Sequence, residues 1–142
     1  MSAHYTKLIA KSSLALLLLF GISTIGRTEV VQVDNTTLQE LMSQGVQLID
    51  VRRLEEWQET GVVEGSTRET FFDEKGNYDA NKWLGELQEL ANKDQPVALI
   101  CWTGVRSNVI ANWLSNGLGY KTVYNVKKGI KDWIGDELPV VQ

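Results

Sequence analysis

Short runs of apolar and β-branched residues alternate along this chain with stretches that have the residue spacing of amphipathic helices. The runs occupy residues 30–33, 46–51, 97–100 and 122–126, and runs of this length and composition are typical of interior strands. Strands that alternate with helices predict an α/β fold in which a central, mostly parallel sheet is flanked by helices on both faces. In such folds the functional side chains gather at the carboxyl ends of the strands.

Five helical segments are expected between or after these strands. The first covers residues 37–42 and is capped by Asp34 or Asn35, and the second is a helical turn at 54–57. The third carries an apolar stripe of Trp83, Leu84, Leu87, Leu90 and Ala91 and ends before Pro96. The fourth covers residues 107–118 with Val109, Ile110, Trp113 and Leu114 on one face, and the fifth is a short helix that holds Ile130, Trp133 and Ile134. Residues 61–77 are expected to form loops and turns.

The first 26 residues differ from the rest of the chain. His4, Lys7 and Lys11 precede a charge-free, largely apolar segment from residue 12 to residue 25, and this order predicts a secretory signal peptide over residues 1–26. An uncleaved anchor is the alternative, and only in that case is contact with a membrane expected, although the segment is shorter than the roughly 20 residues of a membrane-spanning helix. The protein is thus expected to be exported, and to be periplasmic if its source is a Gram-negative bacterium. Residues 30–142 then form one domain.

The charge balance of the chain excludes nucleic acid as an expected partner. Without the leader the chain keeps 12 basic and 18 acidic residues, and its longest basic run is Lys127-Lys128. A protein that binds the phosphate backbone normally carries a basic patch or stripe instead. No Cys, His and carboxylate cluster with metal-ligand spacing is present in the sequence, so no metal site is expected.

Cys101 is the only cysteine of the chain. It directly follows the strand at 97–100 and precedes a helical stretch, and a strand-to-helix turn of this kind directs backbone N–H groups toward one point. Such a setting binds anions and favours the thiolate form of a cysteine. Cys101 is therefore the candidate nucleophile, with a buried, unreactive packing cysteine as the alternative.

The cysteine and histidine counts narrow the chemistry further. An exported protein with one cysteine cannot close an internal disulfide, which leaves the thiol free or paired with another chain. The only histidine, His4, lies in the predicted leader. Because the mature domain would then lack an imidazole for a Cys-His pair, cysteine-protease chemistry is excluded.

Three groups of residues resemble, in order and spacing, the rhodanese-like (thiosulfate sulfurtransferase) domain. They are Asp50-Val51-Arg52 at a strand end, Glu56-Trp57 followed by Gly61 and Gly65-Ser66, and Cys101-Trp102-Thr103-Gly104-Val105-Arg106-Ser107 about fifty residues after the first group. The resemblance covers roughly residues 30–141. It implies a rhodanese-like α/β domain that takes a sulfane sulfur from a donor such as thiosulfate or a persulfide, holds it as a Cys101 persulfide, and passes it to a thiol or cyanide.

The resemblance also implies a role for each residue of the motif. The backbone of Trp102, Thr103, Gly104, Val105 and Arg106 would bind the persulfide and the substrate, which is a small sulfur-containing anion or a thiol. The side chains of Trp102 and Thr103 would point outward and shape the entrance. No metal or organic cofactor is implied, and no protein acceptor is defined.

The charged residues of the motif are expected either to bind a donor or to support the loop. Arg106 either binds the oxyanion of a donor or braces the loop against Asp50, and bracing is favoured. Asp50 and Arg52 are interpreted as structural supports of the loop. Trp102 supplies no positive charge for thiosulfate, so a thiol-borne or hydrophobic donor is an open alternative, and Arg68 is a candidate second cation near the entrance.

Two other functions remain open from the sequence. Cysteine phosphatases and arsenate reductases use a related Cys-x5-Arg loop, but the spacing here is Cys-x4-Arg, which leaves less room for a tetrahedral phosphate ester. The other alternative is a carrier that binds persulfide sulfur for a partner protein with little turnover of its own. Cys101 by itself does not separate the carrier from the enzyme.

Overall fold

The computed structural model describes residues 28–142 of the chain. The predicted leader over residues 1–26 lies outside this part and stays a prediction, as does the export that depends on it. Of the helices in the described part, none combines the length and the apolar character that a membrane crossing requires.

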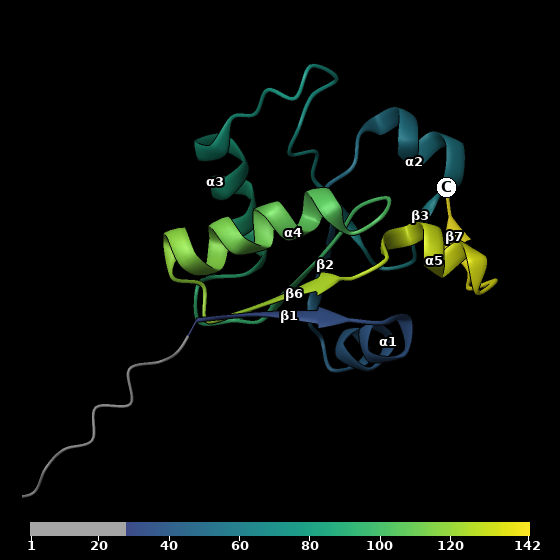
Figure 1. The fold of residues 1–142 in the computed structure, drawn as a ribbon, viewed down its shortest axis with the longest axis horizontal. Coiled ribbons are helices and arrows are strands. Elements are labelled where there is room, and N and C mark those ends of the chain that lie inside the picture. Colours follow the sequence, from purple (N-terminus) through teal and green to yellow (C-terminus); the bar gives the residue numbers. More distant parts are fainter. Residues whose placement is uncertain (1–27) are drawn as a thin grey trace, which may run out of the picture.

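The described residues form a sequence of strands and helices that alternate for most of its length (Figure 1). In chain order the elements are β1 (Glu29–Val33), α1 (Asn35–Ser43), β2 (Gln47–Asp50), α2 (Leu54–Thr60), β3 (Val62–Val63), β4 (Thr67–Arg68), α3 (Ala80–Leu90), β5 (Val97–Ile100), α4 (Val105–Asn112), the π-helical turn η1 (Trp113–Gly117), β6 (Thr122–Val126), α5 (Gly129–Gly135) and β7 (Val140–Val141). The predicted α/β class is confirmed.

The central sheet has five strands in the order β1-β6-β5-β2-β4, and every pairing in it is parallel. β5 lies between β6 and β2, so Cys101, which follows β5, leaves the sheet near its middle. Strand order reverses around this region, and in open parallel sheets such crevices at the carboxyl ends of strands are where ligands bind. β3 and β7 form a separate antiparallel pair.

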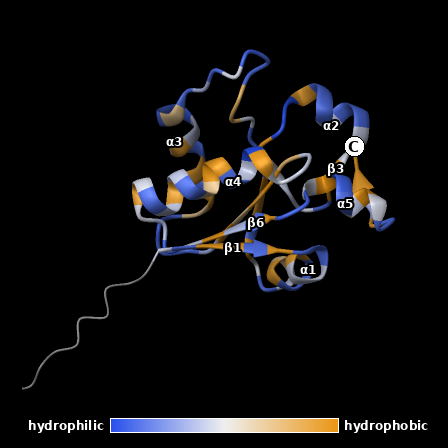
Figure 2. Ribbon diagram, viewed as in Figure 1, coloured by the Kyte–Doolittle hydropathy of each residue, from blue (hydrophilic) through white to orange (hydrophobic). Residues whose placement is uncertain are grey.

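Two hydrophobic clusters cover the two faces of the sheet. One cluster joins alternate sheet residues such as Ile49 and Leu99 to side chains of α3 and α4. The other joins their neighbours Leu48 and Ile100 to side chains of α1 and α5. Figure 1 shows α3 and α4 on one side of β1 and β6 and α1 on the other. In Figure 2 these helices carry both hydrophobic and hydrophilic stretches, as helices with one buried side do.

The structure departs from the sequence expectations in several elements. The helix expected at 107–118 begins earlier, at Val105, and changes to the wider η1 turn at Trp113. Its buried stripe follows Ser107, Ile110 and Leu114, so Val109, expected on the inward face, is 57% exposed. The expected helix before Pro96 ends sooner, at Leu90.

Three short strands were not predicted, and each has only two residues. β4 joins the edge of the central sheet, while β3 and β7 pair with each other. A strand of two residues is too short to show an alternation of polar and apolar side chains. The strands that pair with β3 and β4 are also distant in the sequence, so local sequence does not predict the pairing. Ile134, expected to face inward with Trp133, is half-exposed.

A buried ion pair links β2 to the segment that follows it. The guanidinium of Arg52 donates to both carboxylate oxygens of Asp50, with N···O distances of 2.9 Å from Nε to Oδ1 and 2.7 Å from Nη2 to Oδ2, and neither side chain is exposed. Arg52 also donates to Thr60 Oγ1 and to the carbonyl oxygen of Gly61. The pair therefore holds the end of α2 against the carboxyl end of the sheet.

We predict that Asp50→Asn lowers the free energy of unfolding by about 3 kcal/mol, because it leaves the buried Arg52 charge without its counterion. Urea unfolding followed by tryptophan fluorescence measures the change. Lys82→Ala is the matched control, since it removes the exposed Lys82–Glu86 pair and should cost about 0.5 kcal/mol at most. Equal losses in the two variants would contradict the structural role of the Asp50–Arg52 pair.

Candidate active site

The reactive loop runs from the end of β5 to the start of α4. Cys101 follows β5 directly, and Gly104 caps α4 with a φ of 86°, a left-handed conformation that favours glycine. A Cβ atom at Gly104 would overlap the carbonyl groups of Lys127 and Val126. Only glycine therefore lets the backbone of the loop lie directly on the segment that connects β6 to α5.

The same segment is bonded to the loop by its own backbone. Ile130 N donates to the carbonyl oxygen of Cys101 at 2.9 Å, and Lys131 N donates to that of Trp102 at 3.1 Å. Gly129 has a φ of 66°, and a Cβ atom there would overlap the backbone of Cys101 and Trp102. The loop and the start of α5 thus form one tightly packed unit.

The Sγ atom of Cys101 lies inside this unit with two polar neighbours. The backbone N–H of Gly104 donates to it at 3.2 Å, and Ser107 Oγ lies 3.3 Å away. Cys101 is 1% exposed. Of the backbone N–H groups expected to bind a sulfur anion, that of Gly104 is the one bonded to Sγ in this structure.

Trp102 and Thr103 point outward, as predicted. Trp102 is 36% exposed, and Thr103 is also exposed. Val105, for which no direction was predicted, is 67% exposed.

Arg106 braces the loop, but against a different carboxylate from the one expected. Its Nη1 and Nη2 atoms donate to the two carboxylate oxygens of Glu56 at 2.9 and 2.6 Å. The prediction that Arg106 pairs with Asp50 is wrong, because both carboxylate oxygens of Asp50 already accept hydrogen bonds from the buried Arg52. The Arg106–Glu56 pair therefore joins α4 to α2.

The pair perturbs the ionisation of both partners. Partial burial acts to raise the pKa of Glu56, but bonds from Arg106 and from the backbone N–H of Arg53 outweigh it and hold that pKa below its usual value of 4.5. The hydrogen bond to Glu56 raises the pKa of Arg106. Both groups are thus charged at neutral pH, and the charge of Arg106 is largely balanced.

Sequence reasoning missed three polar residues of the site. Ser107 and Glu56 lie in the quoted motifs but received no role, and Asn125 lies in a strand that otherwise read as apolar. Ser107 Oγ is 2.6 Å from Asn125 Oδ1, and both residues are buried. The available signal was the presence of a polar amide in the interior of a strand, where burial is unfavourable without hydrogen-bond partners.

Two hollows of unlike charge flank the loop. One, of about 290 Å³, borders Trp102 and is lined by Arg52, Glu56, Glu59, Thr60 and Trp102. The other, of about 440 Å³, borders Thr103 and is lined by Thr103, Lys127, Lys128, Lys131, Asp132 and Gly135. We call the second the lysine groove. Arg68, the candidate second cation, lines neither hollow.

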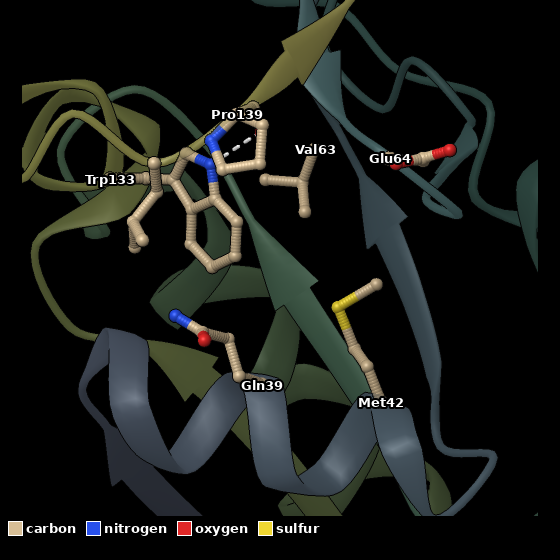
Figure 3. Close-up of a pocket in the computed structure, with 7 residues that line it drawn as sticks. Gln39, Met42, Val63, Glu64, Trp133 and Pro139 are labelled. Carbon is tan, nitrogen blue, oxygen red and sulfur yellow. Dashed lines mark hydrogen bonds between the residues drawn. The ribbon is translucent and has the colours of Figure 1, made fainter.

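A third hollow lies away from the loop, between α1, β3 and the segment from α5 to β7 (Figure 3). Gln39 and Met42 rise from α1 toward Val63 and Trp133, whose indole N–H donates to the carbonyl oxygen of Pro139 at 2.9 Å. Its volume is about 250 Å³, and no residue of the reactive loop lines it. Among residues 28–142, no three Cys, His, Asp or Glu side chains gather as metal ligands.

The chain belongs to a class of α/β domains that have a central parallel sheet, helices on both faces and a cysteine loop after the middle strand. Comparison with known proteins specifies the family. The profile of the Rhodanese-like domain matches residues 34–136. The chain belongs to the rhodanese-like domain family.

Individual relatives agree with this assignment. The chain is 30% identical over 102 residues to the thiosulfate sulfurtransferase GlpE of Haemophilus influenzae, covering 71% of this chain and 85% of that protein. A rhodanese-related protein of Thermoplasma volcanium superposes with a TM-score of 0.56 at 26% identity, over 78% of this chain and 97% of the other. The polysulfide-sulfur transferase homodimer of Wolinella succinogenes shares the fold, with a TM-score of 0.60 at 22% identity over 79% and 78% of the two chains.

We predict that Glu56→Gln lowers the stability of the domain by about 1 kcal/mol at neutral pH, the upper end for a partly exposed ion pair. Because the pKa of Glu56 is lower in the folded state, its contribution is present above pH 4.5 and is lost as the pH falls through the folded value. Urea unfolding at pH 7 and pH 3 measures this. Glu59→Gln, which removes a carboxylate that is not bonded to Arg106, is the control and should cost less than Glu56→Gln at pH 7. A constant deficit for Glu56→Gln at both pH values would contradict the prediction.

Proposed function

We propose that this protein is a sulfurtransferase that carries sulfane sulfur as a persulfide on Cys101. The observation that supports the proposal most directly is the position of Sγ, at the carboxyl end of the middle strand and bonded to the Gly104 N–H, in a chain of the rhodanese-like family. An N–H donor at this point favours negative charge on sulfur. The relative GlpE is named a thiosulfate sulfurtransferase.

The proposed reaction has two displacement steps at sulfur. The Cys101 thiolate attacks the outer sulfur of thiosulfate, the S–S bond of the donor breaks, and sulfite leaves with the bonding electron pair. A thiolate or cyanide then attacks the outer sulfur of the persulfide, and Sγ leaves as the thiolate. Neither leaving group must be protonated, so the chemistry needs no histidine as a general acid.

Other residues of the motif support the loop in this proposal. Both Nη atoms of Arg106 donate to Glu56, which favours bracing over binding of a donor oxyanion. Asp50 and Arg52 hold the end of α2 and act as structural supports. The exposed side chains of Trp102 and Thr103 border the two hollows beside the loop.

A persulfide carrier with little turnover is the second candidate. The observation that favours it is the burial of Cys101, which is 1% exposed, because a buried sulfur is protected from adventitious acceptors. The enzyme and the carrier differ in how fast the persulfide is released.

Incubation of the protein with thiosulfate should add the mass of one sulfur atom to the intact chain, as measured by mass spectrometry. Cys101→Ser removes the nucleophile and should show no added sulfur and no thiocyanate formation from thiosulfate and cyanide. Ser115→Ala, which changes a buried hydroxyl remote from the loop, is the control. Sulfur transfer by Cys101→Ser would overturn the proposal, and sulfur uptake with very slow release to cyanide would assign the carrier role.

The lysine groove supports an anionic sulfur donor. The sequence alone left thiosulfate in doubt because Trp102 brings no positive charge, but Lys127, Lys128 and Lys131 lie beside Thr103 from a different segment of the chain. The backbone bond from Lys131 to Trp102 fixes this segment against the loop. The one carboxylate in the groove, Asp132, is paired with Lys128 at 3.4 Å, which leaves a net positive groove.

We expect the double variant Lys127→Ala/Lys131→Ala to lower kcat/KM for thiosulfate about three- to tenfold at low ionic strength, mainly through a higher KM. High salt, which shortens the screening length to about 3 Å, should abolish the difference. The control Lys75→Ala/Lys93→Ala removes the same charge away from the groove, and equal losses with it would contradict a role of the groove in donor recognition.

A further inference from the structure

A chain of hydrogen bonds leads from the buried Cys101 to the surface. Ser107 Oγ lies 3.3 Å from Cys101 Sγ and 2.6 Å from Asn125 Oδ1. Asn125 Nδ2 donates to Gln32 Oε1 at 2.7 Å, and Gln32 Nε2 donates to Asn108 Oδ1 at 2.8 Å. Parallel pairing of β1 with β6 sets Gln32 beside Asn125. Cys101, the proposed nucleophile, is thus connected through Ser107 to polar side chains on β6, β1 and α4.

The orientation of the Asn125 amide is determined by a backbone carbonyl. Asn125 Nδ2 donates to the carbonyl oxygen of Gly104 at 3.2 Å, and that oxygen can only accept. A rotated amide would set Oδ1 against it. The Nδ2 atom therefore faces Gly104 and Gln32, and the Oδ1 atom faces Ser107, where it can only accept a hydrogen bond.

The hydroxyl of Ser107 has a single proton for two neighbours. The 2.6 Å contact with Asn125 Oδ1 requires Ser107 to donate, and in the described part of the chain no other donor reaches this oxygen. Toward Cys101 the hydroxyl then presents a lone pair, which suits a thiol that donates its S–H. When Cys101 is a thiolate, Sγ and Asn125 Oδ1 both need the same proton.

We infer that Asn125 is a positioning residue that restrains the ionisation of Cys101 by competing for the hydroxyl proton of Ser107. To stabilise the thiolate, Ser107 must turn to Sγ and leave a buried amide oxygen without a donor, which is unfavourable. Once sulfur is bound, the negative charge moves to the outer sulfur of the persulfide and Ser107 can donate to Asn125 again. This inference rests on the proposed role of Cys101. The competition for the Ser107 proton makes the loaded persulfide more favourable relative to the free thiolate.

Several charged groups belong to the elements packed around Cys101. They are Arg106 on α4, Asp50 at the end of β2, Arg52 after it, Glu56 on α2, Lys127 and Lys128 between β6 and α5, and Lys131 and Asp132 on α5. None of them exchanges a hydrogen bond with the side chains of Ser107 or Asn125 in the described structure, so substitution of Asn125 leaves all of these charges in place. A change in thiolate formation on substitution of Asn125 therefore does not come from a lost charge, and the Ser107→Ala background separates the Ser107 proton from the Asn125 bond to the Gly104 carbonyl.

The test is the rate of alkylation of Cys101 by iodoacetamide as a function of pH, followed by mass spectrometry. Asn125→Ala and Asn125→Val both remove the competing acceptor, and the second also fills the space. Each should shift the rate profile to lower pH, with alkylation about five- to tenfold faster at pH 7 and an unchanged rate at the high-pH plateau. Ser107→Ala should shift the profile the other way, and the exposed control Asn112→Ala should not move it.

The double variant Asn125→Ala/Ser107→Ala decides whether Asn125 acts through Ser107. If it does, the double variant alkylates like Ser107→Ala alone. An unshifted profile for both Asn125 variants, with the fold intact by circular dichroism, would overturn the inference. A higher alkylation rate at the high-pH plateau without a shift of the profile would also overturn it, because this result means that the site has opened. An equal acceleration by Asn125→Ala in the Ser107→Ala background would overturn it as well. Because alkylation needs no sulfur donor, a protein that never takes up sulfur would refute the proposed function separately.

Discussion

Direct packing of two backbone segments is the constraint on which the site depends. Residues 101–104 lie against residues 126–130, and glycine at positions 104 and 129 is what permits this approach, since a Cβ atom at either place would overlap the opposite backbone. Two backbone hydrogen bonds, from Ile130 and Lys131, join the segments. The position of Cys101 Sγ, the direction of the Gly104 N–H and the nearness of the lysine groove all follow from this one contact.

The charges around the loop are divided between support and recognition. Arg52 and Arg106 are the two arginines of the motif, and each is paired in bidentate fashion, Arg52 with Asp50 and Arg106 with Glu56. Their charges are therefore balanced within the domain and stabilise the positions of α2 and α4. Unbalanced positive charge comes from lysines in another segment, which a substrate would meet beside Thr103 rather than at the sulfur itself.

Two hydrogen-bonding groups lie close to Sγ, the Gly104 N–H and the Ser107 hydroxyl. The Gly104 N–H favours negative charge on Sγ, whereas Asn125 withdraws the hydroxyl proton of Ser107 that would otherwise do the same. In the inferred arrangement the free thiolate competes with Asn125 for the Ser107 proton, and the loaded persulfide does not. Burial of an amide in an interior strand is tolerated here because its nitrogen has two acceptors and its oxygen has one donor.

The sequence by itself determined the α/β class, the core strands and the position of Cys101 directly after one of them, because these follow from local periodicity, and the resemblance of the motif implied the outward direction of Trp102 and Thr103. Only the tertiary structure decided that the strand before Cys101 is the middle one, which carboxylate holds Arg106, that Ser107 donates to Asn125, and that three lysines border the loop. These contacts join residues from separate elements, such as Arg106 with Glu56 fifty positions earlier. Residue spacing along a chain determines which face of an element a side chain occupies, but the partner on another element depends on how the sheet and helices pack.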